Sequence, residues 1–197
     1  HTRLQGDWNS DVCSSDLKAL IRVEGVPLLE LQARRVREAG ASTLWVSHAH
    51  GSQPAFPTPW DVRWLPDEAP GVGPWPGVMR ALRATKADAL LVLAVDLPAM
   101  TAGFLRRLVE RAACGMGCIP RSAGGLEPLC ALYPLPSALL AAEAMDPKGE
   151  PSPRRLAEEG IRDGWMRSFV VHEADAPFLV NWNHPADWTP ADTNPAD

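Results

Sequence analysis

The feature that most constrains the fold is an apolar run that ends at a single carboxylate. Residues 89–95 carry no polar side chain, and Asp96, Leu97 and Pro98 follow them directly. A run of this length and composition is typical of a strand buried on both faces of a parallel sheet. Because open α/β sheets bind ligands beyond the carboxyl ends of their strands, Asp96 is predicted to lie at a binding edge.

A carboxylate at such a position needs a partner, since burying it unpaired is costly. A nearby cation, a cluster of hydrogen-bond donors or a phosphate-bound Mg²⁺ would each supply one. The alternative is that Asp96 caps the helix predicted to open near Thr101. The residues alone leave these explanations open.

Composition limits the classes of function. The 197 residues are 46% hydrophobic, which is enough for one core and predicts a single domain. A net charge of −5 offers no broad basic surface for a nucleic-acid backbone, and no apolar run approaches the length of a membrane span. Neither nucleic-acid nor membrane binding is therefore expected. The cysteine spacing, including Cys114 and Cys118, fits no common zinc motif and indicates free thiols in a reducing cytoplasm.

From Lys18 onward, short apolar strands alternate with amphipathic helices. This rhythm predicts a doubly wound α/β core with a mostly parallel sheet. A Pro-rich stretch, 53–76, is too long and broken for regular structure apart from one short strand, and such loops are often functional. The elements expected in this half are a helix from Pro27 to Gly40, strands at 43–47 and 62–65, a helix at 78–85, the strand ending at Asp96, and a helix at 101–113.

The second half changes character around the turn 122–125. Strands on both sides of this turn predict a small antiparallel excursion on the sheet. A tail from Thr189, with repeated Pro-Ala-Asp, is expected to be disordered. The other predicted elements are strands at 117–120 and 127–133, helices at 137–145 and 152–159, and closing strands at 169–171 and 178–180.

The first residues show neither helical nor strand periodicity. Residues 7–17 closely resemble the conceptual translation of a common sequencing-library adapter, from which they differ at Asn9. We therefore predict that 1–17 is a non-native stretch, that the domain occupies 18–188, and that 189–197 is the disordered tail. The alternative is a natural polar arm.

A set of motifs, each weak alone, carries a family resemblance through its order and spacing over nearly all of 18–188. Together they resemble the molybdenum cofactor guanylyltransferases, the MobA-like branch of the nucleotidyltransferases. The resemblance implies a three-layer α/β/α Rossmann-like fold. The motifs are Lys18-Ala-Leu20, Glu24-Gly25-Val26-Pro27-Leu28-Leu29-Glu30, Gly73-Pro74 with Gly77, Val95-Asp96-Leu97-Pro98, Glu127-Pro128-Leu129, and Asn181-x-Asn183-x-Pro185.

The resemblance implies transfer of GMP from GTP to the terminal phosphate of molybdopterin, with release of pyrophosphate. An oxyanion must attack an α-phosphate that is already negative, so catalysis consists of in-line positioning and charge neutralisation. By this likeness Asp96 and Lys18 are catalytic and contact the nucleotide. Asp96 would hold Mg²⁺, and Lys18 would neutralise phosphate oxygens.

The same likeness assigns further contacts to both substrates. Simpler explanations exist for each assigned residue, and they stay open: a solvated lysine, a turn-forming aspartate, loop histidines at His48 and His50, glycines that only punctuate a loop, and asparagines that satisfy backbone groups. Arg154 and Arg155 either meet the pterin phosphate or line a solvated helix face. The assigned contacts are His48, Asp67, Gly73, Pro74 and Gly77 for the nucleotide, and Asn181 and Asn183 for the second substrate.

One departure from the family pattern bears on activity. The family opens with a strand and a Gly-rich loop whose backbone N–H groups cradle the triphosphate. The adapter-like stretch occupies that place here, and Leu17 stands where an acidic residue is usual before the lysine. We therefore expect weak GTP binding and poor turnover.

Three functions remain open at this level. The first is the guanylyltransferase. The second is a CTP-dependent molybdopterin or a sugar-phosphate nucleotidyltransferase, which would share the fold, Mg²⁺ and Asp96. The third is a non-catalytic binding module that offers a surface to a molybdoenzyme or its chaperone. Nucleotide competition and titration with Mg²⁺-GTP distinguish them.

Overall fold

The computed structural model describes residues 15–49, 62–67, 73–112, 115–145 and 149–182. The strands are β1 (Arg22–Val23), β2 (Val26–Pro27), β3 (Leu44–Ala49), β4 (Val62–Asp67), β5 (Ala89–Leu93), β6 (Gly117–Ser122), β7 (Gly125–Leu126), β8 (Cys130–Pro134) and β9 (Met166–Val170). The helices are α1 (Ser15–Leu20), α2 (Leu28–Glu38), α3 (Trp75–Ala84), α4 (Ala102–Arg111), α5 (Ser137–Ala144), α6 (Pro153–Arg162) and the 3₁₀ helix η2 (Glu173–Leu179).

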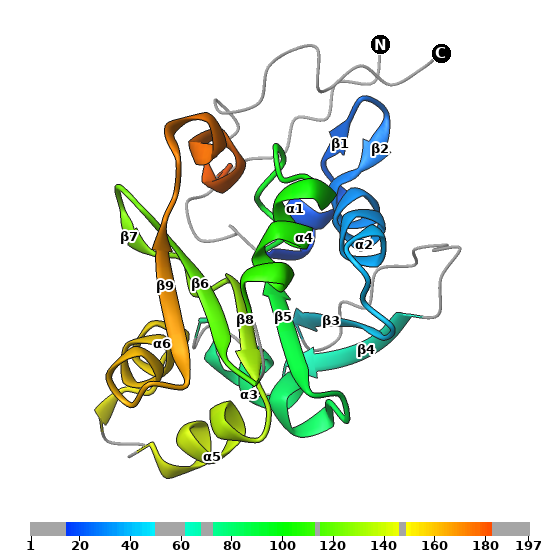
Figure 1. Cartoon of the computed structure of the whole chain (residues 1–197). Coiled ribbons are helices and arrows are strands. Elements are labelled where there is room, and N and C mark those ends of the chain that lie inside the picture. The colour runs from blue at the N-terminus through cyan, green and yellow to red at the C-terminus, as the bar shows by residue number, and fades with distance from the viewer. Residues whose placement is uncertain (1–14, 50–61, 68–72, 113–114, 146–148, 183–197) are drawn as a thin grey trace.

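The largest sheet is mixed and has β8 between β5 and β6 (Figure 1). β8 runs antiparallel to both neighbours, with Tyr133 opposite Leu90 on β5 and Leu132 opposite Cys118 on β6. β7 folds back on β6, and β9 lies parallel to β6 on the outer side.

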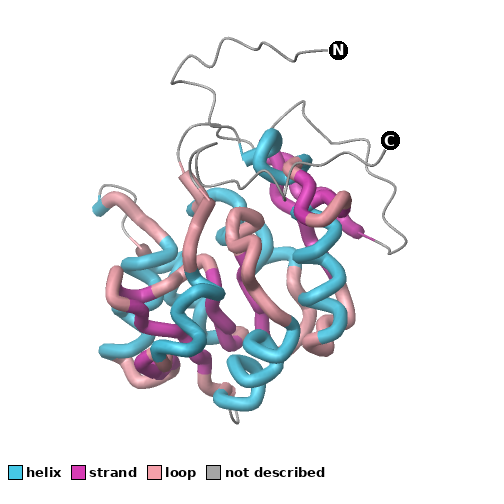
Figure 2. Tube along the Cα trace, turned by 90° about the horizontal axis from the view of Figure 1, so that it is seen from above, coloured by secondary structure: helices cyan, strands magenta, loops and turns pink. Residues whose placement is uncertain are grey.

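Side chains of this sheet alternate between two separate cores. On β8, Ala131 and Tyr133 pack with α3, α5 and α6, whereas Cys130 packs with α4 and η2 on the other face. On β5, Leu90 and Leu91 divide in the same way. Because successive side chains point to opposite faces of a strand, each face of the sheet has an apolar surface that helices cover. The view from above also shows helices on both faces (Figure 2). The predicted three-layer α/β/α fold is confirmed.

The antiparallel part of the sheet is larger than the small excursion predicted. Among the described ladders, β3 with β4 and β6 with β9 are parallel, whereas both neighbours of β8 are antiparallel to it. Connection length explains the difference. The turn after Ser122 is too short for a crossover and joins β6 to β7 as an antiparallel hairpin, whereas the longer connection from β8 through α5 and α6 lets β9 lie parallel to β6.

β3 and β4 form their own parallel ladder, from Leu44 opposite Val62 to Ala49 opposite Asp67. Within the described residues, no ladder joins β3 to β5. α3 contacts β3, β4 and β5, so this helix packs on both sheets.

The strand before Asp96 ends earlier than predicted. β5 stops at Leu93, and the Ala94 N–H then donates to Leu129 O at 2.7 Å before the chain turns through Asp96. The next helix, α4, is capped by Thr101, whose hydroxyl accepts from the Phe104 N–H at 3.1 Å. The carboxylate of Asp96 is therefore not the cap of α4.

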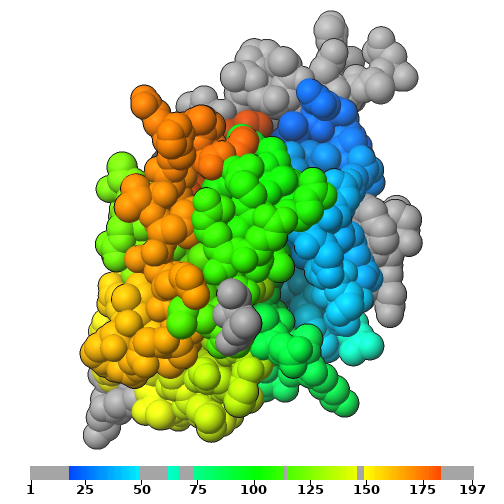
Figure 3. Space-filling view, in the orientation of Figure 1, coloured from blue at the N-terminus to red at the C-terminus, as the bar shows by residue number. Residues whose placement is uncertain are grey.

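The strand predicted at 178–180 is wrong, because the chain forms η2 there. Pro177 has no N–H to donate to a ladder, and the His172 side chain accepts from Ala174 N at the start of the turn. η2 lies against α4 (Figure 3). Arg107 Nη2 on α4 is 2.7 Å from Asp175 Oδ1 on η2.

Two cysteines, Cys118 and Cys130, are buried free thiols as predicted, whereas Cys13 and Cys114 lie outside the described residues. Burial raises the pKa of both described thiols, that of Cys130 to about 12. None of the helices in the described ranges is long and apolar enough to cross a bilayer.

Candidate active site

An ion pair between two residues far apart in the sequence forms the centre of the site. Lys18 Nζ lies 3.0 Å from Asp96 Oδ2, although 78 positions separate them. The side chains retain 16% and 19% of their exposure, so both charges are mostly shielded from water. This contact contradicts a freely solvated Lys18. It also provides the cationic partner that the Asp96 carboxylate was expected to need.

The turn that carries Asp96 is held by contacts to three successive carbonyls. The Gln32 amide on α2 donates from Nε2 to Leu97 O at 2.7 Å and to Val95 O at 3.3 Å. The Trp182 N–H donates to Asp96 O at 2.9 Å. The backbone on both sides of the carboxylate is therefore fixed from two distant parts of the chain.

The contact of Trp182 brings the segment 181–182 to the Asp96 turn. Asn181 is exposed there, immediately before the residue that donates to Asp96 O. Asn183, the other residue assigned to the second substrate, lies outside the described residues.

His48 lies on a strand, which contradicts the alternative explanation of this residue as a loop histidine. It is on β3, 7% exposed, with its ring edge-on to Trp64 at 5.6 Å between centroids. β3 continues past its predicted end at Ser47, and His48 pairs in register with Pro66 of β4. His50 lies outside the described residues.

The glycines before and within α3 have different structural requirements. Gly73 has φ +77°, a conformation that favours glycine, and the exposed Pro74 precedes α3 directly. A Cβ on Gly77 would lie 2.5 Å from Ser47 Oγ, so this glycine allows α3 to approach β3 closely.

Asp67 is the last residue of β4, beside the carboxyl end of β3. Its side chain lies outside what is described. Arg80 on α3 donates from Nη1 to Pro66 O at 2.7 Å, which ties the helix to this strand end. Sequence reasoning did not single out Arg80, and its place one helical turn after Gly77 was the available signal.

The predicted catalytic residues and the predicted nucleotide contacts are on neighbouring elements. α1, which carries Lys18, contacts β3, which carries His48, and α3 contacts β3, β4 and β5. Arg155 pairs with Glu159 on its own helix at 3.1 Å and also donates to Gly149 O, which favours its helix-face explanation. Arg154 is exposed beside Gly125 of the β7 turn.

Asp96 fits a divalent cation that the nucleotide shares. The described residues contain no group of three or more His, Cys, Asp or Glu side chains able to hold a metal ion. Mg²⁺ in phosphate-transferring sites is commonly bound through one or two carboxylates, substrate phosphates and water. A single partly buried carboxylate beside a lysine is compatible with that donor set.

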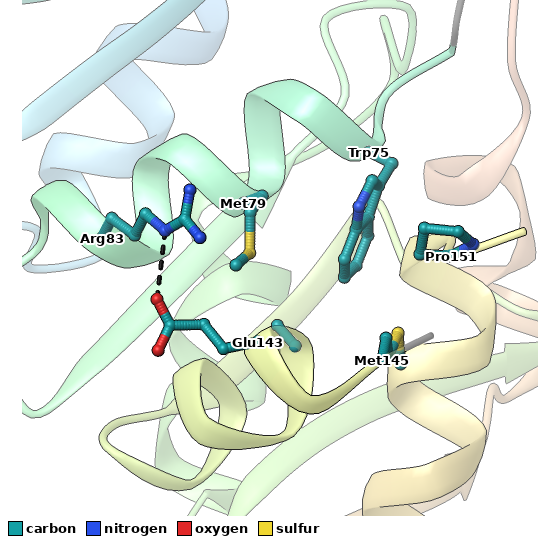
Figure 4. A pocket seen from close by; sticks show the side chains of 7 residues that line it. Trp75, Met79, Arg83, Glu143, Met145 and Pro151 are labelled. Atoms are coloured by element: carbon teal, nitrogen blue, oxygen red, sulfur yellow. Dashed lines mark hydrogen bonds and ion pairs between the residues drawn. The ribbon is translucent and has the colours of Figure 1, made fainter. Parts of the chain in front are cut away.

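A separate cavity of about 270 Å³ lies between α3 and α5 (Figure 4). Trp75 and Met79 line it from α3, and its charged side chains, Arg83 and Glu143, pair with each other at 3.1 Å. None of the predicted site residues lines this cavity.

Comparison with known proteins gives consistent matches. Residues 14–163 match the family described as MobA-like NTP transferase domain. A "Probable molybdenum cofactor guanylyltransferase" of Opitutus terrae is 35% identical over 173 residues, which cover 86% of this chain and 84% of the relative. One of the same name from Synechococcus elongatus is 31% identical, covering 87% of each chain. A solved nucleotidyl transferase from Methanothermobacter superposes with a TM-score of 0.69 at 23% identity, covering 86% of this chain and 81% of that one.

Proposed function

The chain belongs to the MobA-like NTP transferase family, and we propose on this basis that it transfers GMP from GTP to the molybdopterin cofactor. The relatives of 35% and 31% identity are both named as probable molybdenum cofactor guanylyltransferases. The observation in the structure that carries the proposal is the shielded pair of Lys18 and Asp96, which offers a phosphate-binding cation beside a metal-binding carboxylate.

In the proposed reaction, an oxygen of the terminal phosphate of molybdopterin attacks the α-phosphorus of GTP. A P–O bond forms to the α-phosphorus as its bond to the β-phosphate oxygen breaks, and pyrophosphate leaves with that electron pair. Lys18 neutralises phosphate oxygens while charge moves from the attacking to the leaving oxygen. Asp96 would hold Mg²⁺, which supplies charge neutralisation across the phosphates when bound.

The ion pair keeps both Lys18 and Asp96 ready to bind substrate. In the absence of substrate, the Lys18 ammonium balances Asp96 at 3.0 Å, so neither charge is buried alone. When nucleotide arrives, Lys18 exchanges a carboxylate oxygen for a phosphate oxygen, and the Asp96 carboxylate would then be available to hold Mg²⁺. The contacts to the backbone on both sides of Asp96 keep the carboxylate in place during this exchange.

The positions of the helices and strands support the remaining contacts to the two substrates. We assign the nucleotide to the ends of β3 and β4 and the start of α3, where His48, Asp67, Gly73, Pro74 and Gly77 lie. The positive φ of Gly73 supports this assignment, because glycine lets backbone N–H groups approach a ligand closely. We assign molybdopterin to the segment of Asn181 and Asn183, supported by the contact of Trp182 with Asp96.

Residues 1–17 are proposed to limit this activity, with the transferase domain occupying 18–188. The family resemblance requires a strand and a Gly-rich loop before Lys18.

The test is product formation with molybdopterin and either GTP or CTP, with Mg²⁺, in the presence of the Asp96→Asn and Asp163→Asn variants. We expect guanylylated cofactor from GTP, loss of product in Asp96→Asn, and no effect of Asp163→Asn, because Asp163 is an exposed partner of Arg162. Product from CTP alone would establish the alternative nucleotide. Absence of product with either nucleotide, also after 1–17 is replaced by a strand and Gly-rich loop, would favour the binding module.

A further inference from the structure

Gln32 is a buried polar side chain that the proposed reaction does not use. It lies on the inward face of α2 with Leu28, Leu29 and Ala33, and it is only 5% exposed. A glutamine in an apolar stripe must find hydrogen-bond partners there, because an unsatisfied buried amide is costly.

Its amide is fully oriented by the contacts it makes. Nε2 donates to Leu97 O at 2.7 Å and to Val95 O at 3.3 Å, while Oε1 accepts from Arg35 Nη1 at 3.3 Å. Both amide hydrogens face carbonyls, and the oxygen faces a cation. The two ends of the amide are therefore not interchangeable.

These two carbonyls belong to the residues immediately before and after Asp96. A side chain that binds both neighbours restrains the backbone dihedrals between them, and with them the direction in which the Asp96 side chain leaves the backbone. No regular ladder does this, because β5 has already ended at Leu93.

We propose that Gln32 is a positioning residue, which aims the Asp96 carboxylate at Lys18 and at the metal–nucleotide complex by holding the backbone on both sides of Asp96. Only the part of this inference that concerns the metal–nucleotide complex rests on the proposed function. The effect on the Lys18–Asp96 pair stands independently of it.

The first experiment needs no ligand. Competitive acetylation with acetic anhydride, read by mass spectrometry, compares the labelling rate of Lys18 with that of the exposed Lys86 in the full chain. Gln32→Leu keeps the side-chain bulk and removes the donors. We expect Lys18 to be labelled several-fold faster relative to Lys86 in this variant. An unchanged ratio would overturn the positioning role.

The second experiment measures binding of Mn²⁺-GTP by calorimetry. Gln32→Leu is expected to weaken binding roughly 10-fold to 100-fold, as is usual when a group supporting a metal ligand is lost. Ser152→Ala is the control for general destabilisation, since it removes only the cap of α6, and it should change neither binding nor the labelling of Lys18. If Ser152→Ala weakens binding as much as Gln32→Leu does, the effect is one of stability and the proposal fails.

A conservative variant adds a readout that depends on pH. The carboxyl group of Gln32→Glu donates to one carbonyl when protonated and repels both when ionised. Its affinity for Mn²⁺-GTP, divided by that of the unchanged chain at each pH, should therefore rise as the pH falls. A ratio independent of pH would contradict the proposal.

The two experiments separate the possible failures. If neither the unchanged chain nor a chain whose residues 1–17 are replaced by a strand and Gly-rich loop binds Mn²⁺-GTP up to millimolar concentration, the proposed function fails, while the labelling of Lys18 still decides the role of Gln32. If the unchanged chain binds and Gln32→Leu binds equally well, the positioning role fails and the proposed function stands.

Discussion

Asp96 owes its orientation to backbone contacts from distant residues rather than to the strand that precedes it. Gln32 and Trp182 bind successive carbonyls of the turn, and Lys18 binds the carboxylate itself. The sequence indicates Asp96 and Lys18 as chemically active residues, but it does not show that they touch. The role of Gln32 could not be predicted from the sequence, because a glutamine within an apolar helical stripe does not indicate which carbonyl groups it will bind.

At this scale we predict that Lys18→Met lowers kcat/KM for guanylyl transfer by roughly 100-fold, because a charged phosphate-binding group is lost. Lys18→Arg should restore only part of the rate, since a planar guanidinium does not replace a compact ammonium. Steady-state kinetics of product formation give the measurement. Lys86→Met is the matched control, as Lys86 is exposed, and an equal loss in that variant would contradict the role of Lys18.

At the scale of elements, the carboxyl ends of β3 and β4, the start of α3 and the Asp96 turn lie on neighbouring elements joined by α3 packing. The close approach of Gly77 to Ser47 and the contact of Arg80 with Pro66 O hold α3 against these strands. The packing of α3 therefore holds the Gly73-Pro74 segment near the ends of these strands.

Replacing residues 1–17 with a strand and a Gly-rich loop should strengthen GTP binding by at least about tenfold, because a cradle of backbone N–H groups binds phosphates directly. The replacement should also raise the thermal midpoint, as a new strand would pair with β3 and β5. Calorimetric titration with Mg²⁺-GTP and thermal unfolding give the two measurements. A control loop with alanine at the glycine positions should not bind more tightly.

The cap of α4 is a second prediction for an element. Thr101→Ala removes the hydroxyl that accepts from the Phe104 N–H, and it should lower the free energy of unfolding by about 1 kcal/mol. Urea unfolding gives the measurement. Thr101→Ser keeps the acceptor and should lose far less, so equal losses would show that the methyl group and not the cap matters.

Across the whole molecule, two cores on opposite faces of one mixed sheet stabilise the fold, and buried titratable groups lie in both. Cys130 is in the core below α4, and Tyr133 on the same strand is in the core below α3, α5 and α6. Burial raises the pKa of the Cys130 thiol to about 12 and also raises the pKa of Tyr133.

These shifts predict loss of stability in alkali. The folded chain favours the protonated thiol, so its contribution is fully present below the ordinary thiol pKa and is lost as the pH rises towards about 12. Each such group adds a slope of up to about 1.4 kcal/mol per pH unit in this range. Urea unfolding at a series of pH values from 8 upward, spaced by roughly half a pH unit, measures this slope. Cys130→Ala should make it shallower, and an unchanged slope would exclude Cys130 as a source.

The pattern of residues anticipated the fold class because burial leaves a regular mark on the sequence. The apolar run before Asp96, the helical stripe beginning at Leu28 and the turn after Ser122 each predict a local element, and all are present. The strand expected at 178–180 is wrong because the 3₁₀ helix Glu173–Leu179 occupies most of that segment, and three apolar residues are too few to distinguish a strand from a helical turn.

The sequence by itself indicated the fold class, most of the helices and strands, and the residues that carry the charge needed for phosphate chemistry. These properties depend on nearest neighbours and on periods of two or 3.6 residues. Only the tertiary structure decided that β8 separates β5 from β6, that Lys18 meets Asp96, and that Gln32 and Trp182 hold the turn between them. The contacts at the Asp96 turn join residues far apart in the chain, 78 positions for Lys18 and Asp96 and 65 for Gln32 and Leu97, and local sequence patterns carry no record of such pairings.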